Sequence, residues 1–311
     1  MPLRYTLRQL EYFVAVGETG SIAAASQRVN VSSPSISAGV SQLEEELGLK
    51  LFVRHHAQGL TPTPAGLKIL AEARELLQKA AGLRDLAGDL SGLVRGPMAV
   101  GCLSTFAQVL LPGLRRGFTE AYQEVRVTQT EADQLELFSL LRQAKIDMAL
   151  TYDLSLPRDL LFEPLIEMPP LVALAERHPL AAKSEVSVAE LAPHPMVLLD
   201  LPLSTDYFLS FFTRVGLHAN VTERTRDMAV MRSLVANGFG YSIVNVRPIR
   251  DVAPDGTPMK FVPLTGTDSR LRLGLLTTRG VKSTRLHAAF SQFARSWVRD
   301  QSARIFGNHP G

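Results

Sequence analysis

The sequence predicts a small all-α region at the N-terminus, one long helix after it, and a larger α/β region of two lobes. Three observations support this prediction. Three short amphipathic helix patterns occur within the first 48 residues, no strong helix breaker follows between Pro64 and Gly92, and strand and helix patterns alternate from residue 98 onward. A chain of 311 residues has room for two or three such domains.

The composition excludes several classes of protein. Hydrophobic residues make up 46% of the chain and charged residues 20%, as in globular domains. The single cysteine, Cys102, excludes an internal disulfide framework, and its ordinary role is that of a small buried side chain. No Cys/His cluster has zinc-ligand spacing, so we expect no metal and no cofactor. The chain shows no export signal and no uncharged apolar run of about 18 residues, so we expect a cytoplasmic protein without a membrane partner.

The net charge does not by itself indicate a nucleic-acid partner. The whole chain carries +3, but residues 1–60 contain five basic and five acidic side chains. The N-terminal region is therefore neutral, and a prediction of DNA binding has to rest on its geometry.

Cap signals bound each of the three N-terminal helices. Thr6–Gln9 is a capping-box pattern before the first helix, which a glycine-containing turn ends. Ser21 begins the second helix and Asn30 ends it. We expect Ser33 to cap the third helix, with Pro34 at its first position, where the missing N–H has no consequence.

The third helix has one apolar stripe and one polar face. Ile36, Val40, Leu43 and Leu47 recur at steps of four and three residues, so they face the other helices. A helix with short polar side chains on its outer face can enter the major groove of DNA, where Ser and Gln reach base edges and the helix N-terminus meets phosphate. The residues expected to face DNA are Ser33, Ser35, Ser37, Ala38, Ser41 and Gln42.

A short hairpin is expected after the third helix. Residues 51–53 and 59–61 can pair as two strands, with Arg54, His55 and His56 at the tip. Such a wing can lie along the DNA backbone or minor groove, with Arg54 as the strongest contact. The alternative is a surface hairpin that only closes the core.

Residues 7–70 resemble the LysR-type family of bacterial transcriptional regulators. They read LRQLEYFVAVGETGSIAAASQRVNVSSPSISAGVSQLEEELGLKLFVRHHAQGLTPTPAGLKIL, continuous and in the family's order. The matching segments are AAA at 23–25, S-x-P-x-I-S at 32–37, LE-x-x-LG at 43–48 and LF-x-R at 51–54. The resemblance implies a winged helix-turn-helix over residues 1–63 that binds double-stranded DNA.

The sequence departs from the family in the third helix. Many members have a basic residue just after the position of Ser37 and another a turn later, whereas residues 38–41 here are Ala-Gly-Val-Ser. Fewer phosphate contacts predict a shallower salt dependence of DNA binding, with Arg28, Lys50 and Arg54 as the main anchors. Gly39 also lowers helix stability by about 1 kcal/mol relative to alanine.

Residues 64–92 are expected to form a linker helix that dimerises. Apolar residues recur at alternating steps of four and three for about three heptads. The alternative is a solitary helix packed on its own domain. Paired DNA-binding units predict a pseudo-palindromic operator. The resemblance implies a homodimer that commonly assembles into a homotetramer, and RNA polymerase is considered as a further partner. This seam consists of Ile69, Ala73, Leu76, Ala80, Leu83, Ala87 and Leu90.

Residues 93–304 are expected to form two βα lobes with parallel sheets. The first lobe comprises residues 93–163 and 266–304, and the second comprises residues 164–265. We expect the chain to cross between them near Phe162–Ile166 and near Phe261–Thr265. The resemblance implies an effector-binding domain of the periplasmic-binding-protein type.

Residues at strand ends, most of them polar, are the candidates for a ligand site. Ligands of such sheets lie outside the carboxyl ends of the strands. Ser104 and Thr105 follow the strand at 98–103 and open a helix predicted from Phe106 to Ala121, so hydroxyls and free N–H groups there can hold a carboxylate. For each hydroxyl the alternative is an ordinary helix cap. The candidates are Ser104, Thr105, Thr151, Tyr152, Leu203, Ser204 and Asn245.

These patterns distinguish three functions. The first is a DNA-binding transcription regulator controlled by a small molecule, for which an organic acid is the suggested effector. A free solute-binding protein would have an export signal and no N-terminal three-helix region. An α/β enzyme would need a nucleophile elbow, a phosphate loop or metal-ligand spacing, and the chain shows none of these. The sequence therefore favours a regulator without catalytic activity.

Overall fold

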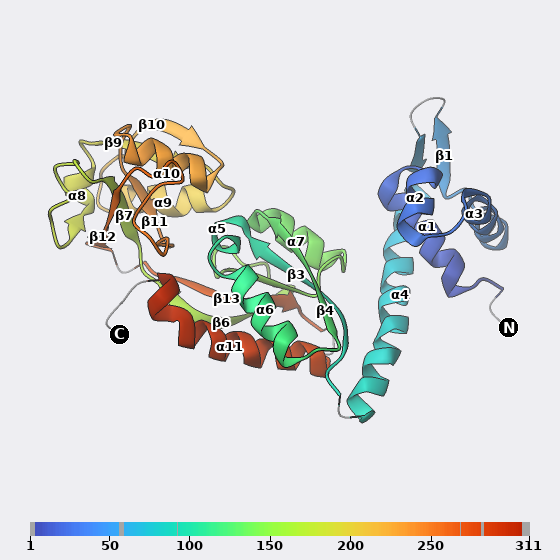
Figure 1. Cartoon of the computed structure of the whole chain (residues 1–311). Helices are drawn as coiled ribbons and strands as arrows, with labels where there is room; N and C mark the ends of the chain where they lie inside the picture. The colour runs from blue at the N-terminus through green and yellow to red at the C-terminus, as the bar shows by residue number, and fades with distance from the viewer. Residues whose placement is uncertain (1–3, 56–58, 92, 268, 281–282, 307–311) are drawn as a thin grey trace. The chain divides into compact units, whose positions relative to one another are not determined.

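The computed structural model describes residues 4–55, 59–91, 93–267, 269–280 and 283–306. The chain divides into two compact units, Met1–Leu93 and Val94–Gly311. Figure 1 shows that the first is mainly helical and that the second contains two lobes of strands and helices. The predicted fold class is confirmed. In the described part of the chain, no helix combines the length and apolarity needed to cross a bilayer.

The N-terminal unit is a three-helix core with a two-stranded wing. Phe13, Ile36 and Leu43 are fully buried where the three helices meet. The capping box of Thr6 and Gln9 is present, as predicted. The elements are α1 (Leu7–Thr19), α2 (Ile22–Val29), α3 (Ser33–Leu47), β1 (Phe52–His55), β2 (Gly59–Pro62) and α4 (Pro64–Ser91).

Helix α3 begins one residue earlier than predicted. Its N-cap is Ser32, which is extended, whereas Ser33 is already helical, so the prediction of Ser33 as the cap was wrong. Pro34 is then the second helical residue. Its missing N–H has no consequence there either, because the first four N–H groups of a helix lack partners within the helix.

The wing is anchored on the turn between α1 and α2. Strands β1 and β2 pair antiparallel, which confirms the predicted hairpin. The backbone N–H of Leu60 donates to the carbonyl of Gly20 at 2.8 Å. A Cβ on Gly59 would lie 2.5 Å from that carbonyl oxygen, and Gly59 has φ +88°, so only glycine fits there. Arg54 and His55 end β1, and His56 lies outside the described residues.

Helix α4 is buried in its own unit near its start and exposes leucine side chains further along. Ala73 is buried in the core of its own unit, and Ile69 packs against that core. Leu76 and Leu83 are 45% and 67% exposed. Ile69 and Ala73 therefore pack on their own domain, as expected for a solitary helix, whereas the exposed Leu76 and Leu83 are available to a second helix. The side chains of Ala87 and Leu90 lie outside the described residues.

The first lobe is a five-stranded sheet in the order β4-β3-β5-β13-β6. Figure 1 shows α7 on one face of the sheet and α6 and α11 on the other. The elements are β3 (Gly96–Leu103), α5 (Ser104–Ala107), α6 (Leu111–Ala121), β4 (Val125–Ala132), α7 (Gln134–Arg142), β5 (Met148–Tyr152), β6 (Leu160–Met168), β13 (Leu271–Thr278) and α11 (Arg285–Phe306).

The prediction of parallel sheets was only partly correct. Strand β3 runs parallel to β4 and β5, but β13 runs antiparallel to β5 and β6. The reason is connectivity. Strand β13 returns from the second lobe and enters the sheet at the edge where β3 and β5 end, so it must run in the opposite direction.

The single helix predicted from Phe106 to Ala121 is two helices, α5 and α6. Pro112 explains the break. In one continuous helix it would lie in the interior, where it lacks an N–H and clashes with the preceding turn. In the structure it lies in the first turn of α6, where no N–H is required.

The second lobe is a mixed sheet between two helices. Its strands pair in the orders β11-β7-β12-β8 and β10-β9, and a bridge between Met196 and Tyr241 joins the two groups. Alternate residues of β9 separate into the two cores: Leu198 with the α9 residue Phe211, and Val197 with the α10 residue Met231. The elements are β7 (Leu171–Ala175), β8 (Val186–Ser187), α8 (Val188–Leu191), β9 (Pro195–Leu199), α9 (Ser204–Thr213), β10 (Asn220–Thr225), α10 (Met228–Ala236), β11 (Ser242–Val244) and β12 (Met259–Thr265).

The crossovers between the lobes lie later than predicted. Strand β6 pairs with β13 from Leu160 to Met168, so residues 162–166 belong to the first sheet. Strand β12 likewise pairs with β7 as far as Pro263. The chain therefore crosses between Met168 and Leu171 and between Thr265 and Leu271. Residues 169 and 170 are both prolines, which cannot donate to a strand ladder and so end β6.

Candidate functional site

Helix α3 presents its predicted DNA-facing residues outside the core. Ile36, Val40 and Leu43 are buried against the other helices. The polar residues lie on the remaining surface: Ser35, Ala38, Ser41 and Gln42 are exposed, and Ser33 and Ser37 are half-buried. The Gln42 side chain accepts a hydrogen bond from Gln9 at 3.0 Å, so α1 orients it.

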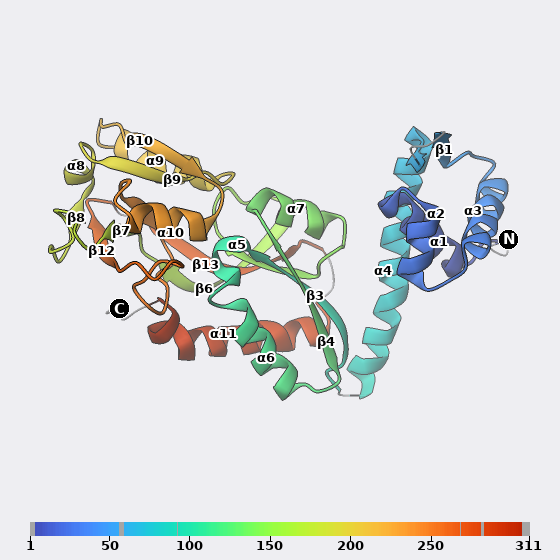
Figure 2. The ribbon, with the colours of Figure 1, turned by 45° about the horizontal axis from the view of Figure 1, so that its top comes forward.

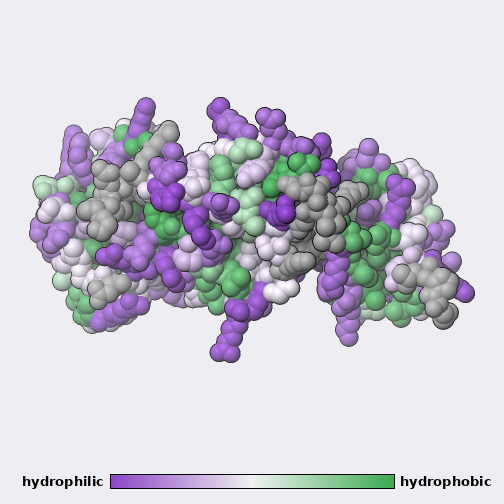
Figure 3. All heavy atoms as spheres, turned by 90° about the horizontal axis from the view of Figure 1, so that it is seen from below, coloured by the Kyte–Doolittle hydropathy of each residue, from purple (hydrophilic) through white to green (hydrophobic). Residues whose placement is uncertain are grey.

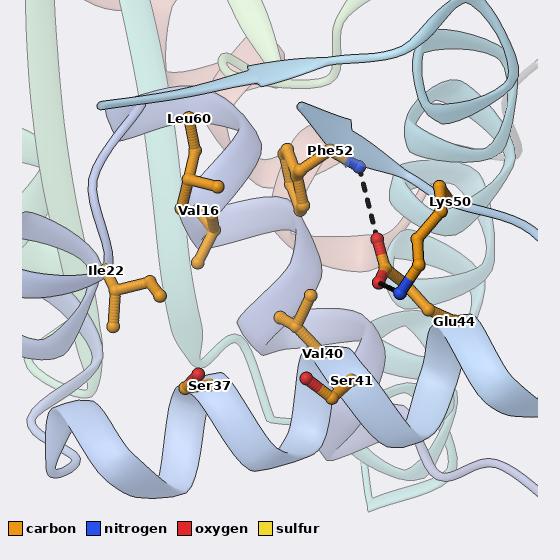
Figure 4. Close-up of a pocket in the computed structure, with 9 residues that line it drawn as sticks. All are labelled: Val16, Ile22, Ser37, Val40, Ser41, Glu44, Lys50, Phe52 and Leu60. Carbon is orange, nitrogen blue, oxygen red and sulfur yellow. Dashed lines mark hydrogen bonds and ion pairs between the residues drawn. The ribbon is translucent and has the colours of Figure 1, made fainter. Parts of the chain in front are cut away.

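A hollow of about 340 Å³ lies between α3 and the wing. Figure 4 shows Ser37 and Ser41 on the side of α3 that faces it, with Phe52 and Leu60 of the wing opposite. Two of the predicted base-reading serines therefore line a polar groove beside the wing. Val16, Ile22, Val40, Glu44 and Lys50 complete its walls.

Glu44 connects α3 to the wing and to Lys50. Its carboxylate accepts hydrogen bonds from the Lys50 ammonium at 3.0 Å and from the backbone N–H groups of Leu51 at 2.8 Å and Phe52 at 3.2 Å. Burial opposes ionisation of this carboxyl, but these donors outweigh burial and lower the pKa of Glu44. Lys50 is thus paired within the unit, although its side chain is exposed.

Arg28, the second predicted anchor, is also paired. Its guanidinium lies 2.6 Å from the buried carboxylate of Glu18, which also binds Arg74 of α4 at 3.0 Å. Arg28 and Lys50, the two predicted DNA anchors whose side chains are described, therefore each form an ion pair with a glutamate. The side chain of Arg54 lies outside the described part.

The N-terminus of α3 is open to solvent. The side chain of Ser32 makes no capping bond to the helix backbone and pairs instead with the hydroxyl of Ser35 at 2.8 Å. The first N–H groups of this 15-residue helix are therefore available to an anion such as a DNA phosphate.

In the first lobe, two of the candidate hydroxyls are buried without partners. The hydroxyl oxygens of Thr105 and Thr151 have no hydrogen-bond partner among the described residues. Ser104 differs, because its hydroxyl donates to the carbonyl of Ala132 at 3.1 Å and ties α5 to β4. Figures 1 and 2 show α5 at the end of β3 nearest the second lobe. Helix α5 has only four residues, so its N-terminus does not support the predicted carboxylate site.

Gln134, which was not predicted as a site residue, contacts the end of β5 next to Thr151. The Gln134 amide nitrogen donates to the carbonyl of Tyr152, the last residue of β5, at 3.1 Å and to the carbonyl of Leu154 at 2.7 Å. Its amide oxygen is buried and unpartnered within the described chain. Tyr152, a predicted site residue, is buried edge-on against Phe106, and burial raises its pKa. The position of Gln134 directly after a helix-capping aspartate gave no signal of this role.

In the second lobe, Leu203 and Ser204 form the turn from β9 into α9. Leu203 has φ +66°, a left-handed conformation that is rare for this residue type, and the Ser204 N–H donates to the Pro202 carbonyl at 2.8 Å. The hydroxyl of Thr205 binds Asp200 at 2.9 Å. Such strain persists only where the surroundings enforce it.

Asn245 lies at the junction of the lobes. Its amide nitrogen donates to the carbonyl of Met168 at 2.7 Å, at the start of one crossover. Its amide oxygen is buried and has no partner among the described residues. Nearby, the hydroxyl of Tyr207 donates to the carbonyl of Ser269 in the other crossover at 3.1 Å, and burial raises the pKa of Tyr207 to about 12.

Arg232 is the second residue that the sequence reasoning missed. It lies on α10 and is only 7% exposed, and a terminal nitrogen of its guanidinium is buried without a partner in the described structure. A signal was present in the sequence, since Arg232 interrupts an otherwise apolar helical stripe. Across the described ranges, no group of three or more His, Cys, Asp or Glu residues could hold a metal ion.

Comparison with known proteins agrees with this architecture. Residues 7–67 match the family model for bacterial regulatory helix-turn-helix proteins of the lysR family, and residues 91–299 match the LysR substrate-binding domain. The chain is 29% identical over 245 residues to the transcriptional regulator CysB of Haemophilus influenzae, covering 76% of this chain and 75% of CysB. It is 26% identical over 295 residues to the dual regulator OxyR of Escherichia coli, covering 93% of this chain and 94% of OxyR.

Solved structures give the same result. HinK, a LysR family transcriptional regulator from Pseudomonas aeruginosa, is 33% identical, with a TM-score of 0.63, 94% of this chain covered and 98% of that chain. A full-length OxyR variant of the same species has a TM-score of 0.74 at 24% identity, over 94% of this chain and 98% of that chain, which shows a shared fold. The substrate-binding model alone spans more than half of the sequence. This chain therefore belongs to the LysR family of transcriptional regulators, with a helix-turn-helix DNA-binding domain and an effector-binding domain.

Proposed function

We propose that this regulator senses a small molecule bound between the two lobes of its second unit. The supporting observation is a set of buried polar atoms without partners on both sides of the junction: the hydroxyls of Thr105 and Thr151 in the first lobe and the amide oxygen of Asn245 in the second, all taken from the described residues. Each such atom destabilises an empty site by about 1–3 kcal/mol, and a ligand that hydrogen-bonds to them removes that cost.

The crossovers offer a way for the ligand to act. Asn245 and Tyr207 each hydrogen-bond to a residue at a crossover, Met168 and Ser269 respectively. A ligand that contacts both lobes favours the arrangement of lobes in which both sets of contacts form. In our proposal this shift alters the dimer and, through α4, the spacing of the two DNA-binding units.

DNA recognition is assigned to α3 and the wing. Ser37 and Ser41 line the groove beside the wing, and the open N-terminus of α3 is suited to a phosphate. Two copies of the chain, joined through the exposed leucines of α4, would read a pseudo-palindromic operator. Figure 3 shows hydrophobic side chains on the surface of the N-terminal unit, at the right of the view, and Leu67, Leu76 and Leu83 of α4 are exposed.

Thiol oxidation is not supported as the signal. Several relatives bear the name hydrogen peroxide-inducible genes activator. Here Cys102 is the single cysteine, so no disulfide can form within the chain. It is fully buried, and burial raises the pKa of its thiol, which disfavours the reactive thiolate. Because the relatives are regulators, we also assign no catalytic activity to the chain.

The test combines ligand binding with DNA binding. A metabolite library is screened for compounds that raise the melting temperature of the full chain. Each hit is then added to a complex of the chain with the DNA upstream of its own reading frame. A hit should change the DNA footprint, and Thr151→Val should lose that response, whereas Thr213→Val on the exposed part of α9 should keep it. A chain that binds ligands but never that DNA contradicts the proposal.

A further inference from the structure

Arg232 occupies a position where packing alone would select an apolar side chain. Its neighbours on the same stripe of α10, one turn away in either direction, are Met228, Val235 and Ala236, and all three are buried. These residues pack against β7 and β9 in the second core of the lobe. Arg232 is buried with them and is only 7% exposed.

The guanidinium has no counter-charge among the described residues. One of its terminal nitrogens is buried without a hydrogen-bond partner, and no carboxylate of the described residues forms an ion pair with it. Burial lowers the pKa of Arg232, and no neighbouring acid in the described structure opposes this effect. An arginine remains charged in proteins, so this site holds a largely buried cation that has no counter-charge among the described residues.

The geometry of α10 directs Arg232 toward the junction of the lobes. Strands β9 and β10 are parallel, and α10 starts directly after the carboxyl end of β10. Side chains of a helix tilt toward its N-terminus. Arg232 lies in the second turn, so by this rule we expect its guanidinium to lean toward the edge at which β9 ends. Ser204 begins α9 at that same edge.

The other unpartnered atoms define the rest of the ligand. Asn245 and Gln134 each use the amide nitrogen to donate to a backbone carbonyl, so their unpartnered atoms are amide oxygens, which only accept, whereas the unpartnered hydroxyls of Thr105 and Thr151 can donate or accept. A matching ligand supplies O–H or N–H donors. Among the buried unpartnered side-chain atoms of the described residues, only the Arg232 nitrogen is cationic. One cation matches one negative charge, as on a carboxylate, better than the charge of nearly two on a phosphate.

We infer that the effector is a small carboxylic acid with one negative charge and at least one hydroxyl or amino donor, and that Arg232 binds its carboxylate. This inference rests on the proposed function, because it assumes that the junction of the lobes holds the effector. The reason to expect an acid is now the Arg232 guanidinium and not the N-terminus of the four-residue helix α5.

The experiment compares wild type with Arg232→Met, which keeps much of the length of the side chain and removes its charge. Arg116→Met, at an exposed arginine of α6, is the control. Thermal melts of the full chain are recorded at constant ionic strength with lactate, glycolate, benzoate, inorganic phosphate or neutral lactamide. Lactate or glycolate should raise the melting temperature of wild type and of the control more than phosphate or lactamide does. Arg232→Met should bind the active carboxylate about tenfold more weakly or worse.

A second measurement does not depend on the probes. Without ligand, Arg232→Met should unfold at a higher urea concentration than wild type, because it removes an uncompensated buried charge. A lower midpoint would mean that Arg232 stabilises the fold through the protein itself, and would overturn the inference. Arg232→Lys, which keeps the charge but loses the planar fork, should retain part of the carboxylate response.

The outcomes separate this inference from the proposed function. DNA binding is measured on the same samples. Should carboxylates bind through Arg232 without changing the DNA footprint, the anion site stands and the proposed function fails. Should a neutral compound from the library change the footprint while no carboxylate binds, the proposed function stands and the inference fails. A response to phosphate alone overturns the assignment of a carboxylate.

Discussion

Gly39 of α3 lies directly against the ring of Tyr12 in α1. A Cβ built at position 39 would be 2.7 Å from the Tyr12 Cδ2 atom, closer than packed side chains allow. The glycine that weakens α3 by its helix propensity is therefore the residue that lets α3 approach α1. The ring of Tyr12 is itself buried and belongs to the core of the N-terminal unit.

Replacing Gly39 by alanine should therefore destabilise the N-terminal unit by about 1–3 kcal/mol, because the overpacked ring has to move. Gly82→Ala is the matched control, since a Cβ at Gly82 of α4 meets nothing within 4 Å. There the gain in helix propensity should stabilise the chain by about 0.5–1 kcal/mol. Calorimetry of the full chain measures both changes. Equal gains from the two alanines would show that Tyr12 does not limit the packing of α3.

The stability of the wing should depend on pH through Glu44. Its pKa is lowered in the folded state from an ordinary value of 4.5. Its stabilising contribution is therefore complete above that value and is lost as the pH falls through the lower folded-state pKa. At pH 7, Glu44→Gln should reduce the free energy of unfolding by about 1 kcal/mol, and this difference from wild type should shrink below about pH 4.5.

Urea unfolding between acid and neutral pH measures this difference for the Glu44 variant. Glu46→Gln is the control, at an exposed glutamate of the same helix. A difference that stays constant over the whole pH range would exclude the carboxylate of Glu44 as its source.

Substitutions along α4 should separate dimerisation from folding. Replacing Leu76 and Leu83 by lysine should lower the oligomeric state in analytical ultracentrifugation and leave the monomer folded, because both side chains are exposed. Ala73→Lys should instead unfold the N-terminal unit, because it places a charge in the core. Full assembly of the double lysine variant would show that α4 does not form the interface.

The wing should supply a phosphate contact through Arg54. Arg54→Ala is expected to weaken binding to all DNA sequences and to reduce the slope of log affinity against log salt by about 1. Arg116→Ala, in the second unit, should leave the slope at its wild-type value. Titration of a labelled DNA fragment over a series of salt concentrations gives the slope, and an Arg54 variant with a wild-type slope would remove the wing from the DNA interface.

Local features of the fold were predictable from sequence. The capping box of Thr6 and Gln9, the hairpin after α3 and the long helix after Thr63 all depend on residues close together in the chain. The break between α5 and α6 could also have been predicted from the sequence, because Pro112 disrupts a continuous helix at this position. Part of the proposed ligand site was predictable as well: Thr105, Thr151 and Asn245 all carry buried polar atoms that lack partners in the described structure.

The sequence alone determined the order and type of the elements and the identity of the polar face of α3, because caps, turns and periodicity act over a few residues. Only the tertiary structure decided the direction of β13, the burial of Ala73 and the pairing of Arg28 with Glu18. It also decided that Arg232 is buried with a guanidinium nitrogen that lacks a partner in the described chain. These properties depend on groups that lie far apart in the chain, and whether a charge is neutralised depends on what folding brings within a few ångströms of it.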